Sequence, residues 1–221
     1  PLPAGVTRQV YVLVVGESLR ADNLQINSYA RETTPNLQAS GQVISLRNFV
    51  SAASVTRKAV PPLFTRRTPQ VEGTFLPEPS VLQAFKEAGF KTYWLTTQAP
   101  FGKDDAGISM VLAQADEVRS VSPEGWRTGV YDADLLPWVD ELLAKTDEPR
   151  QLIVLHTRGS HAQYSLRYPE NFEHFLPSAP AHEAIDPWDA DQLGSLVNAY
   201  DNSVRYTDWF VSQVMARVEH S

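Results

Sequence analysis

The chain has 221 residues, of which 43% are hydrophobic and 20% charged, the proportions of one ordinary globular domain. Acidic residues outnumber basic ones by 26 to 19, and the formal charge of −7 makes duplex nucleic acid a poor partner. The sequence contains no cysteine, which excludes disulfides, thiolate metal sites and cysteine nucleophiles. The longest apolar run, Val10 to Val15, is much shorter than the roughly 20 residues that span a bilayer.

Three strands are predicted from runs of β-branched and aromatic residues. Residues 1–7, which are rich in Pro and Gly, have the composition of a linker remnant. The run Val10 to Val15 ends at Gly16 and is typical of a central strand that is covered on both faces in a parallel sheet. Residues 91–96 and 151–156 predict two more strands of this kind.

Helices are predicted between and after these strands. Apolar residues at helical spacing indicate a helix over 80–88, an amphipathic helix over 132–145 and one long helix over 191–218. The stretch 168–191 lacks periodicity and is rich in Pro, so we expect a long surface loop there. Strands that alternate with helices predict an α/β fold in a single domain.

Candidate site residues follow the first and third predicted strands. In parallel α/β sheets, ligands bind beyond the carboxyl ends of the strands. Glu17 comes directly after Gly16, so its carboxylate would project over this edge of the sheet, although it could also be an ordinary loop residue. His156 and His161 flank a glycine-containing turn, and the sequence leaves open whether they are site residues or satisfied core histidines.

A segment rich in hydroxyls and small side chains, residues 51–62, contains Thr56 just where a short helix could begin. Backbone N–H groups and the helix dipole favour an alkoxide, and any phosphate that it carries, at such an end. The alternative is that Thr56 only caps the helix. Threonine is a weak nucleophile unless a metal or base lowers its pKa, and Glu17 could hold that metal.

Together these motifs resemble the phosphoethanolamine transferases of the alkaline phosphatase superfamily, and the resemblance covers most of the chain. Residues 14–22, with the sequence VVGESLRAD, look like the family's first strand and its metal-binding glutamate, which is Glu17 here. Residues 29–37, YARETTPNL, match the segment that follows.

The resemblance also covers a nucleophile segment and a histidine turn. In residues 54–61, SVTRKAVP, Thr56 matches the threonine that takes up the phosphoethanolamine group. In residues 155–169, His161 matches the histidine near the substrate phosphate. Weaker matches place Gln98 and Lys103 on the strand and loop that contact the donor's phosphate.

A further match covers residues 200–208, which look like the family's long helix. We expect the polar residues of this stretch to pack or cap rather than react.

The resemblance implies a three-layer α/β sandwich around a mostly parallel sheet, alkaline-phosphatase-like, with residues 1–221 forming the N-terminal portion of one catalytic domain. The family completes its metal site with an Asp-His pair in a later segment, and no such segment occurs in this sequence. Zn²⁺, or another divalent metal, would bind Glu17, Thr56 and that absent pair. We therefore expect the chain alone to bind zinc weakly and to have little or no transferase activity.

The implied reaction moves phosphoethanolamine from phosphatidylethanolamine through a phosphothreonine at Thr56, with His161 assisting, to lipid A, a core sugar or a glucan. Relatives that act on lipid A often carry a disulfide where this chain has Ala52 and Pro62, so the acceptor stays open. The resemblance also implies a monomer whose catalytic domain faces the periplasm, attached to the bacterial inner membrane by segments that precede Pro1.

Other functions remain possible at this point. A type I sulfatase needs a Cys/Ser-x-Pro-x-Arg sequence, which is absent, so that activity is excluded. A phosphoglycerol transferase or a phosphatase would keep Glu17, Thr56 and His161 and change only the pocket around the leaving group. A non-catalytic protein that retains the fold as an interaction module is the alternative from another class.

Overall fold

The computed structural model describes residues 6–46, 48–68, 70, 78–100, 106–122, 128–182, 186 and 188–221. Within these ranges four strands form one sheet in the order β1-β4-β2-β3, and all of its neighbouring strands run parallel. The strands are β1 (Gln9–Val15), β2 (Lys91–Thr96), β3 (Glu117–Ser120) and β4 (Arg150–His156).

Six α-helices lie in the described ranges: α1 (Pro35–Ser40), α2 (Thr56–Phe64), α3 (Val81–Glu87), α4 (Ala106–Leu112), α5 (Leu136–Leu143) and α6 (Ala190–Glu219). Short 3-10 helices occur at Ala21–Asn23, Gln25–Asn27, Asp132–Leu135, Tyr164–Leu166 and Glu170–Phe172. No helix within these ranges is long and apolar enough to cross a bilayer.

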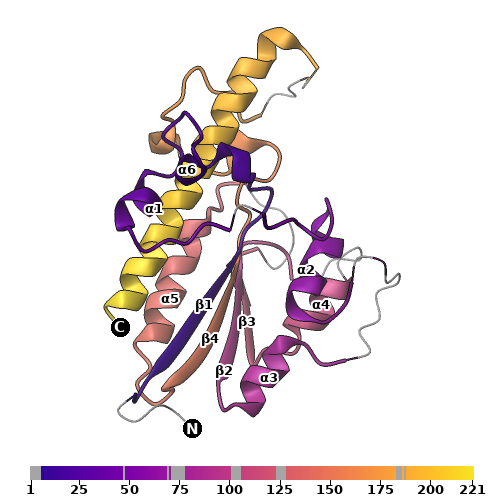
Figure 1. Ribbon diagram of the computed structural model, residues 1–221, viewed down its shortest axis with the longest axis vertical. Helices are drawn as coiled ribbons and strands as arrows, with labels where there is room; N and C mark the ends of the chain where they lie inside the picture. The colour runs from indigo at the N-terminus through magenta and orange to yellow at the C-terminus, as the bar shows by residue number, and fades with distance from the viewer. Residues whose placement is uncertain are drawn as a thin grey trace.

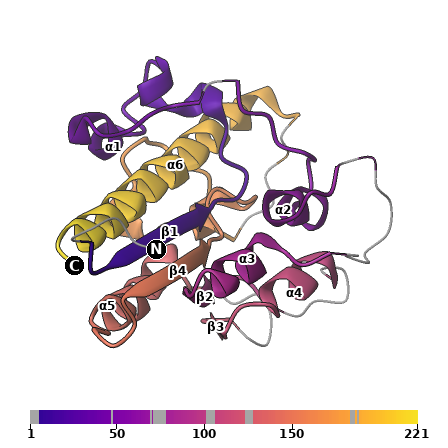
Figure 2. The same cartoon turned by 60° about the horizontal axis from the view of Figure 1, so that its bottom comes forward.

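The sheet lies between two helical layers, as Figures 1 and 2 show. Helices α2, α3 and α4 cover one face, where Phe64 packs on Trp94 with ring centroids 5.0 Å apart. Helices α5 and α6 cover the other face, where Leu155 and Phe210 are fully buried. The predicted three-layer α/β sandwich with a parallel sheet is therefore confirmed.

The prediction that Val10 to Val15 forms a central strand covered on both faces is wrong. In the described structure β1 pairs with β4 and lies at one edge of the sheet. The side chains of Tyr11 and Leu13 are 49% and 40% exposed. A continuous apolar run records the hydrophobicity of a strand's faces and not whether both of its edges are paired, so the pattern could not place β1 within the sheet.

Most other predicted elements are confirmed. α3 and α6 agree with the predicted helices to within one residue at each end. The helix predicted over 132–145 divides into a 3-10 turn and α5, because Pro137 stands in the first turn of α5. The sequence does not predict strand β3, since its four residues, EVRS, include a single apolar side chain.

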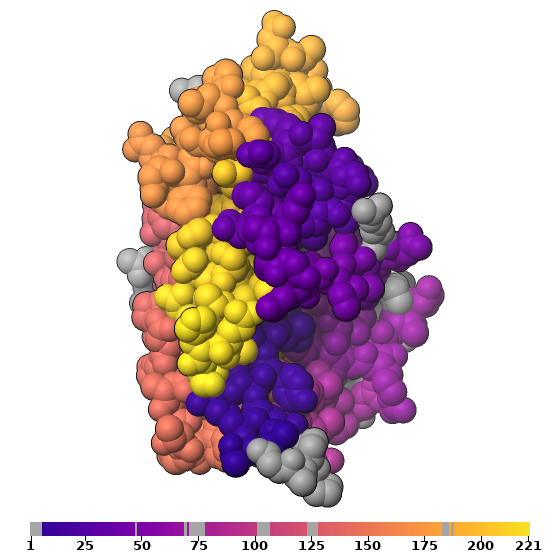
Figure 3. Space-filling model, turned by 60° about the vertical axis from the view of Figure 1, so that its left-hand side comes forward, coloured from indigo at the N-terminus to yellow at the C-terminus, as the bar shows by residue number. Residues whose placement is uncertain are grey.

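Helix α6 fixes the segment that follows β1. Tyr200 accepts a hydrogen bond from the Arg20 backbone N–H (2.8 Å) and donates one to the Ser18 carbonyl (2.8 Å). The Asp208 carboxylate accepts the backbone N–H groups of Asn36 and Leu37 at the start of α1. Figure 3 shows this segment, in purple, lying along the yellow α6. The polar residues in 200–208 thus pack and cap, as predicted.

Candidate active site

Four of the predicted site residues lie at or near the carboxyl edge of the sheet. Glu17 follows β1, Gln98 follows β2 and His161 belongs to the turn that follows β4. Thr56 is the first residue of α2. Lys103 lies outside the described residues, so its predicted role is not addressed.

Thr56 and Glu17 meet at this edge. The hydroxyl of Thr56 donates a short hydrogen bond to Glu17 Oε2, across 39 positions of sequence. The other carboxylate oxygen, Oε1, accepts the hydroxyl of Ser18 at 2.9 Å. The N-cap of α2 is Val55, and no side chain caps this helix. The hydroxyl of Thr56 is therefore directed at a carboxylate and is not a capping group.

The turn after β4 packs directly against the backbone of Glu17. Ser160 N–H donates to the Glu17 carbonyl at 2.9 Å. Gly159 has a φ of +49°, and a Cβ at that position would lie 2.8 Å from both the backbone N and O of Glu17. Only glycine combines this left-handed backbone with so close an approach. The turn that carries His161 and the loop that carries Glu17 thus form one unit.

A buried carboxylate, Asp132, holds the other side of this turn. It is 2% exposed and accepts three hydrogen bonds, from Thr97 Oγ1 (2.9 Å), Arg158 N–H (2.8 Å) and Gly159 N–H (3.0 Å). Burial raises the pKa of Asp132 above its ordinary value, while these donors act in the opposite direction. Sequence reasoning missed this residue, because an aspartate in the first turn of a predicted helix is commonplace.

The side chain and the carbonyl of Gln98 both form hydrogen bonds within the protein. Its side-chain Nε2 donates to the Thr157 carbonyl at 2.7 Å, and its own carbonyl accepts the Ser120 hydroxyl at 2.9 Å. The ends of β2 and β4 are therefore tied together beside the histidine turn. Its predicted contact with substrate stays a prediction.

The first histidine of the turn motif, His156, differs from the second. It is 3% exposed, lies edge-on to the Trp94 ring at 5.7 Å, and burial lowers its pKa to about 4. At neutral pH it is an uncharged core residue. His161 is only partly buried, which leaves it the histidine of this turn that can meet a ligand.

The donors at Glu17 and Thr56 fit a divalent metal in part. A carboxylate oxygen and a hydroxyl oxygen already in contact are suitable ligands for zinc, which usually takes four. Across the described ranges, no group of three or more His, Cys, Asp or Glu could hold a metal ion. Two suitable donor atoms are therefore in contact, and the described residues add no further cluster.

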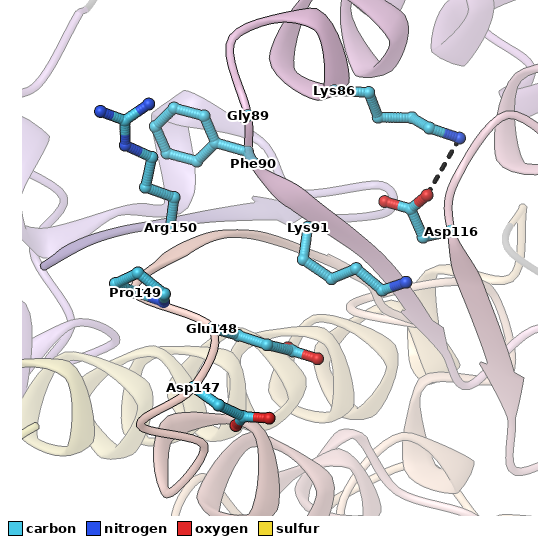
Figure 4. Close-up of a pocket in the computed structure, with 9 residues that line it drawn as sticks. All are labelled: Lys86, Gly89, Phe90, Lys91, Asp116, Asp147, Glu148, Pro149 and Arg150. Atoms are coloured by element: carbon cyan, nitrogen blue, oxygen red, sulfur yellow. Dashed lines mark ion pairs between the residues drawn. The ribbon is translucent and has the colours of Figure 1, made fainter. Parts of the chain in front are cut away.

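A cavity of about 420 Å³ lies at the opposite end of the sheet, where β2 and β4 begin (Figure 4). Both acidic and basic side chains line the cavity, and Lys86 forms an ion pair with Asp116 at 3.1 Å within it. Lys91 and Arg150 also line it. Glu17, Thr56, Gln98 and His161, the site residues that the structure describes, do not line this cavity, so the candidate active site is a different place on the molecule.

Comparison with known proteins identifies the family of this chain. The sequence pattern of the sulfatase family matches residues 9–221. The chain belongs to the sulfatase family. Within that family it is similar to phosphoethanolamine transferase EptC of Escherichia coli K12, with 28% identity over 218 residues that make up 96% of this chain and 37% of EptC.

Solved structures of phosphoethanolamine transferases are also similar to this chain. The zinc complex of the C-terminal periplasmic domain of E. coli EptC has 27% identity and a TM-score of 0.81, and the match covers 98% of this chain and 61% of that domain. The integral membrane protein lipooligosaccharide phosphoethanolamine transferase A (EptA) of Neisseria meningitidis has 30% identity and a TM-score of 0.82, with 100% and 40% covered.

These matches confirm the alkaline-phosphatase-like architecture and the resemblance to phosphoethanolamine transferases. The chain spans about a third of the length of the curated relatives it matches.

Proposed function

We propose that the protein containing this chain transfers phosphoethanolamine from phosphatidylethanolamine to a glycolipid or glycan of the bacterial cell envelope. The observation that carries the proposal is the hydrogen bond from the Thr56 hydroxyl to Glu17, at the N-terminus of α2 and beside the histidine turn. Support for the transferred group comes from the relatives, which are named phosphoethanolamine transferases.

In the proposed first step, Thr56 Oγ1 attacks the phosphorus of the donor as the bond from phosphorus to the diacylglycerol oxygen breaks. The Thr56 proton already lies on a hydrogen bond to Glu17, which accepts it. His161 delivers a proton to the leaving oxygen, so diacylglycerol departs and Thr56 carries phosphoethanolamine. The N–H groups at the start of α2 favour the negative charge that develops on the phosphoryl oxygens.

In the second step, an acceptor hydroxyl or phosphate oxygen attacks the phosphothreonine. A hydroxyl acceptor gives its proton to His161, whereas with an ionised phosphate acceptor His161 takes a proton from water. Thr56 recovers its own proton from Glu17, and the site returns to its starting state. Gln98, Lys103 and His161 are the residues that we propose contact the substrate's phosphate.

Glu17 and Thr56 are the proposed ligands of Zn²⁺, and another divalent metal could bind the same oxygens. When bound, such a metal lowers the pKa of a coordinated hydroxyl and stabilises charge on phosphoryl oxygens. The zinc complex of the EptC domain supports this choice of metal. We expect the 221-residue chain alone to bind zinc weakly and to have little or no transferase activity, because the described residues bring only these two predicted ligands together.

We further propose that residues 1–221 are the N-terminal portion of one catalytic domain, that 1–7 is a linker, and that the protein works as a monomer. Its proposed location is the periplasmic side of the bacterial inner membrane, a location supported by the names of its solved relatives.

The experiment is to incubate the full-length protein with phosphatidylethanolamine in detergent micelles and to map the modified residue by mass spectrometry. The expected result is one phosphoethanolamine group on Thr56, which is absent in Thr56→Val and retained in the matched control Ser54→Ala. A group on Ser54, or transfer to an acceptor with no modified Thr56 at any time, would contradict the proposal. Phosphatidylglycerol and a phosphomonoester as alternative donors test the two related reactions.

A further inference from the structure

We infer that Asp132 is a positioning residue for this reaction, one that sets His161 in place relative to Thr56. The inference rests on the proposed function. Asp132 lies at the start of the 3-10 helix Asp132–Leu135, and its carboxylate is bound to both of the turns that lead from strand ends into the site. Among the described residues, its carboxylate binds Thr97, Arg158 and Gly159, none of which is a proposed ligand or substrate contact, so we expect its effect on catalysis to act through the backbone that it holds.

The two oxygens of the Asp132 carboxylate accept hydrogen bonds from different donors. Oδ1 accepts the hydroxyl of Thr97, which follows β2, and the backbone N–H of Arg158, which follows β4. Oδ2 accepts the backbone N–H of Gly159. Asp132 therefore joins the ends of two neighbouring strands and at the same time fixes two consecutive amides of the histidine turn.

The held turn leads directly to His161. The His161 N–H donates to the Arg158 carbonyl at 3.2 Å and closes the turn, while Ser160 N–H reaches the Glu17 carbonyl at 2.9 Å. The turn is thus held by the Asp132 side chain on one side and by the Glu17 backbone on the other. If the first support is lost, His161 can move relative to Glu17 and its partner Thr56, although every proposed reacting group is still present.

The three donors around Asp132 fit a carboxylate at this position. An ionised carboxylate only accepts hydrogen bonds, as three surrounding donors need. An asparagine has the same shape, but one of its two terminal groups is an NH₂ donor. In one orientation this NH₂ group faces the N–H of Gly159, and in the other it faces the Thr97 hydroxyl and the Arg158 N–H. Because the site is buried, the unpaired amide cannot turn to water, and the turn must shift instead.

The test compares Asp132→Asn with the matched control Asp134→Asn in the full-length protein, using phosphatidylethanolamine as the donor. Asp134 belongs to the same 3-10 helix but is exposed, and among the described residues its carboxylate accepts the N–H of Tyr131. We expect Asp132→Asn to lower kcat about 10- to 100-fold, the effect of a small misplacement of a reacting group. KM for the donor should stay within about threefold, and Asp134→Asn should behave as the parent.

A second variant, Thr97→Val, removes one donor and leaves the carboxylate in place. It is expected to lower kcat by about threefold or more with KM unchanged, since the tie between the two strand ends is lost. If Asp132→Asn does not fold, this variant decides the question, and a parental kcat for Thr97→Val then overturns the inference.

Measuring kcat at lower temperature distinguishes a loss of positioning in the variant from a loss of folded protein. A loss of kcat that persists at a temperature where circular dichroism shows the variant fully folded supports positioning, whereas recovery of the parental kcat on cooling overturns it. Thr56→Val serves as the reference for the proposed function itself. An inactive Thr56→Val beside a fully active Asp132→Asn refutes only the positioning role, and an active Thr56→Val refutes the proposed function.

Discussion

The α-carbon of Gly159 lies so close to the backbone of Glu17 that a methyl group there would be 2.8 Å from both the N and the O of Glu17. The contact joins the turn after β4 to the loop after β1. It explains why a glycine with a φ of +49° stands between two residues, Arg158 and Ser160, that are both buried.

Gly159→Ala should therefore destabilise the protein by about 3 kcal/mol or more, because backbone must move as well as adopt a left-handed conformation. The matched control is Gly41→Ala. Gly41 has a φ of +65° with no atom within 4 Å of the added methyl, so only the conformational cost of about 1 kcal/mol is expected. Denaturant titration measures both. Equal losses of unfolding free energy in the two variants would contradict the close contact.

His156 should make the stability of the protein depend on pH. Its pKa is lowered by burial to about 4, so between about pH 6.5 and pH 4 the unfolded chain binds a proton that the folded chain does not. Stability therefore falls as the pH falls through this window, by about 3 kcal/mol in total.

The measurement is the free energy of unfolding of the parent and of His156→Gln at pH 7 and at pH 4. The parent should lose more stability between these two conditions than His156→Gln does. The control variant is His220→Gln, whose histidine is exposed beyond the end of α6. Equal losses in the parent and in His156→Gln would show that His156 does not account for the pH dependence.

Asp201 should be a strong point of attachment for the segment after β1. Its carboxylate is fully buried and binds Arg31 at 2.7 Å, Tyr29 at 2.8 Å and Asn23 at 3.0 Å. Asp201→Asn leaves the Arg31 guanidinium without its counter-charge and should cost about 3 kcal/mol.

The control is Asp22→Asn, which breaks an ion pair with Arg20 that is exposed on both sides. No measurable change is expected there, since exposed pairs contribute little. A thermal unfolding scan distinguishes the two variants. If both shift the transition equally, the buried ion pair is not the main attachment of this segment.

Some parts of the fold and of the candidate site could be predicted from sequence patterns, and others could not. The strand pattern placed Glu17 at the carboxyl edge of the sheet. Thr56 follows no strand, and it could be paired with Glu17 from the sequence because both residues match motifs of one family. The edge position of β1 was not predictable, since strand order is set by pairing between distant segments. Pro137 moved the start of the predicted helix from residue 132 to Leu136, but α5 still covers one face of the sheet.

Asp132 shows the limit most clearly. In the sequence it cannot be told from Asp134, two residues later, because both are acidic and stand in the first turn of a helical pattern. Only the folded chain places one of them beneath the histidine turn and the other in solvent. Residue types alone likewise left His161 and His156 undecided; the family resemblance favoured His161, and burial shows that His156 is a core residue.

The most direct test of the central claim is a structure of the full-length protein grown with zinc, in which anomalous scattering locates the metal. The account predicts one zinc ion bound by a Glu17 oxygen and by Thr56 Oγ1, each about 2.0–2.2 Å away, and no zinc at that point in Glu17→Gln. Zinc bound elsewhere while Glu17 and Thr56 share no ion would contradict it.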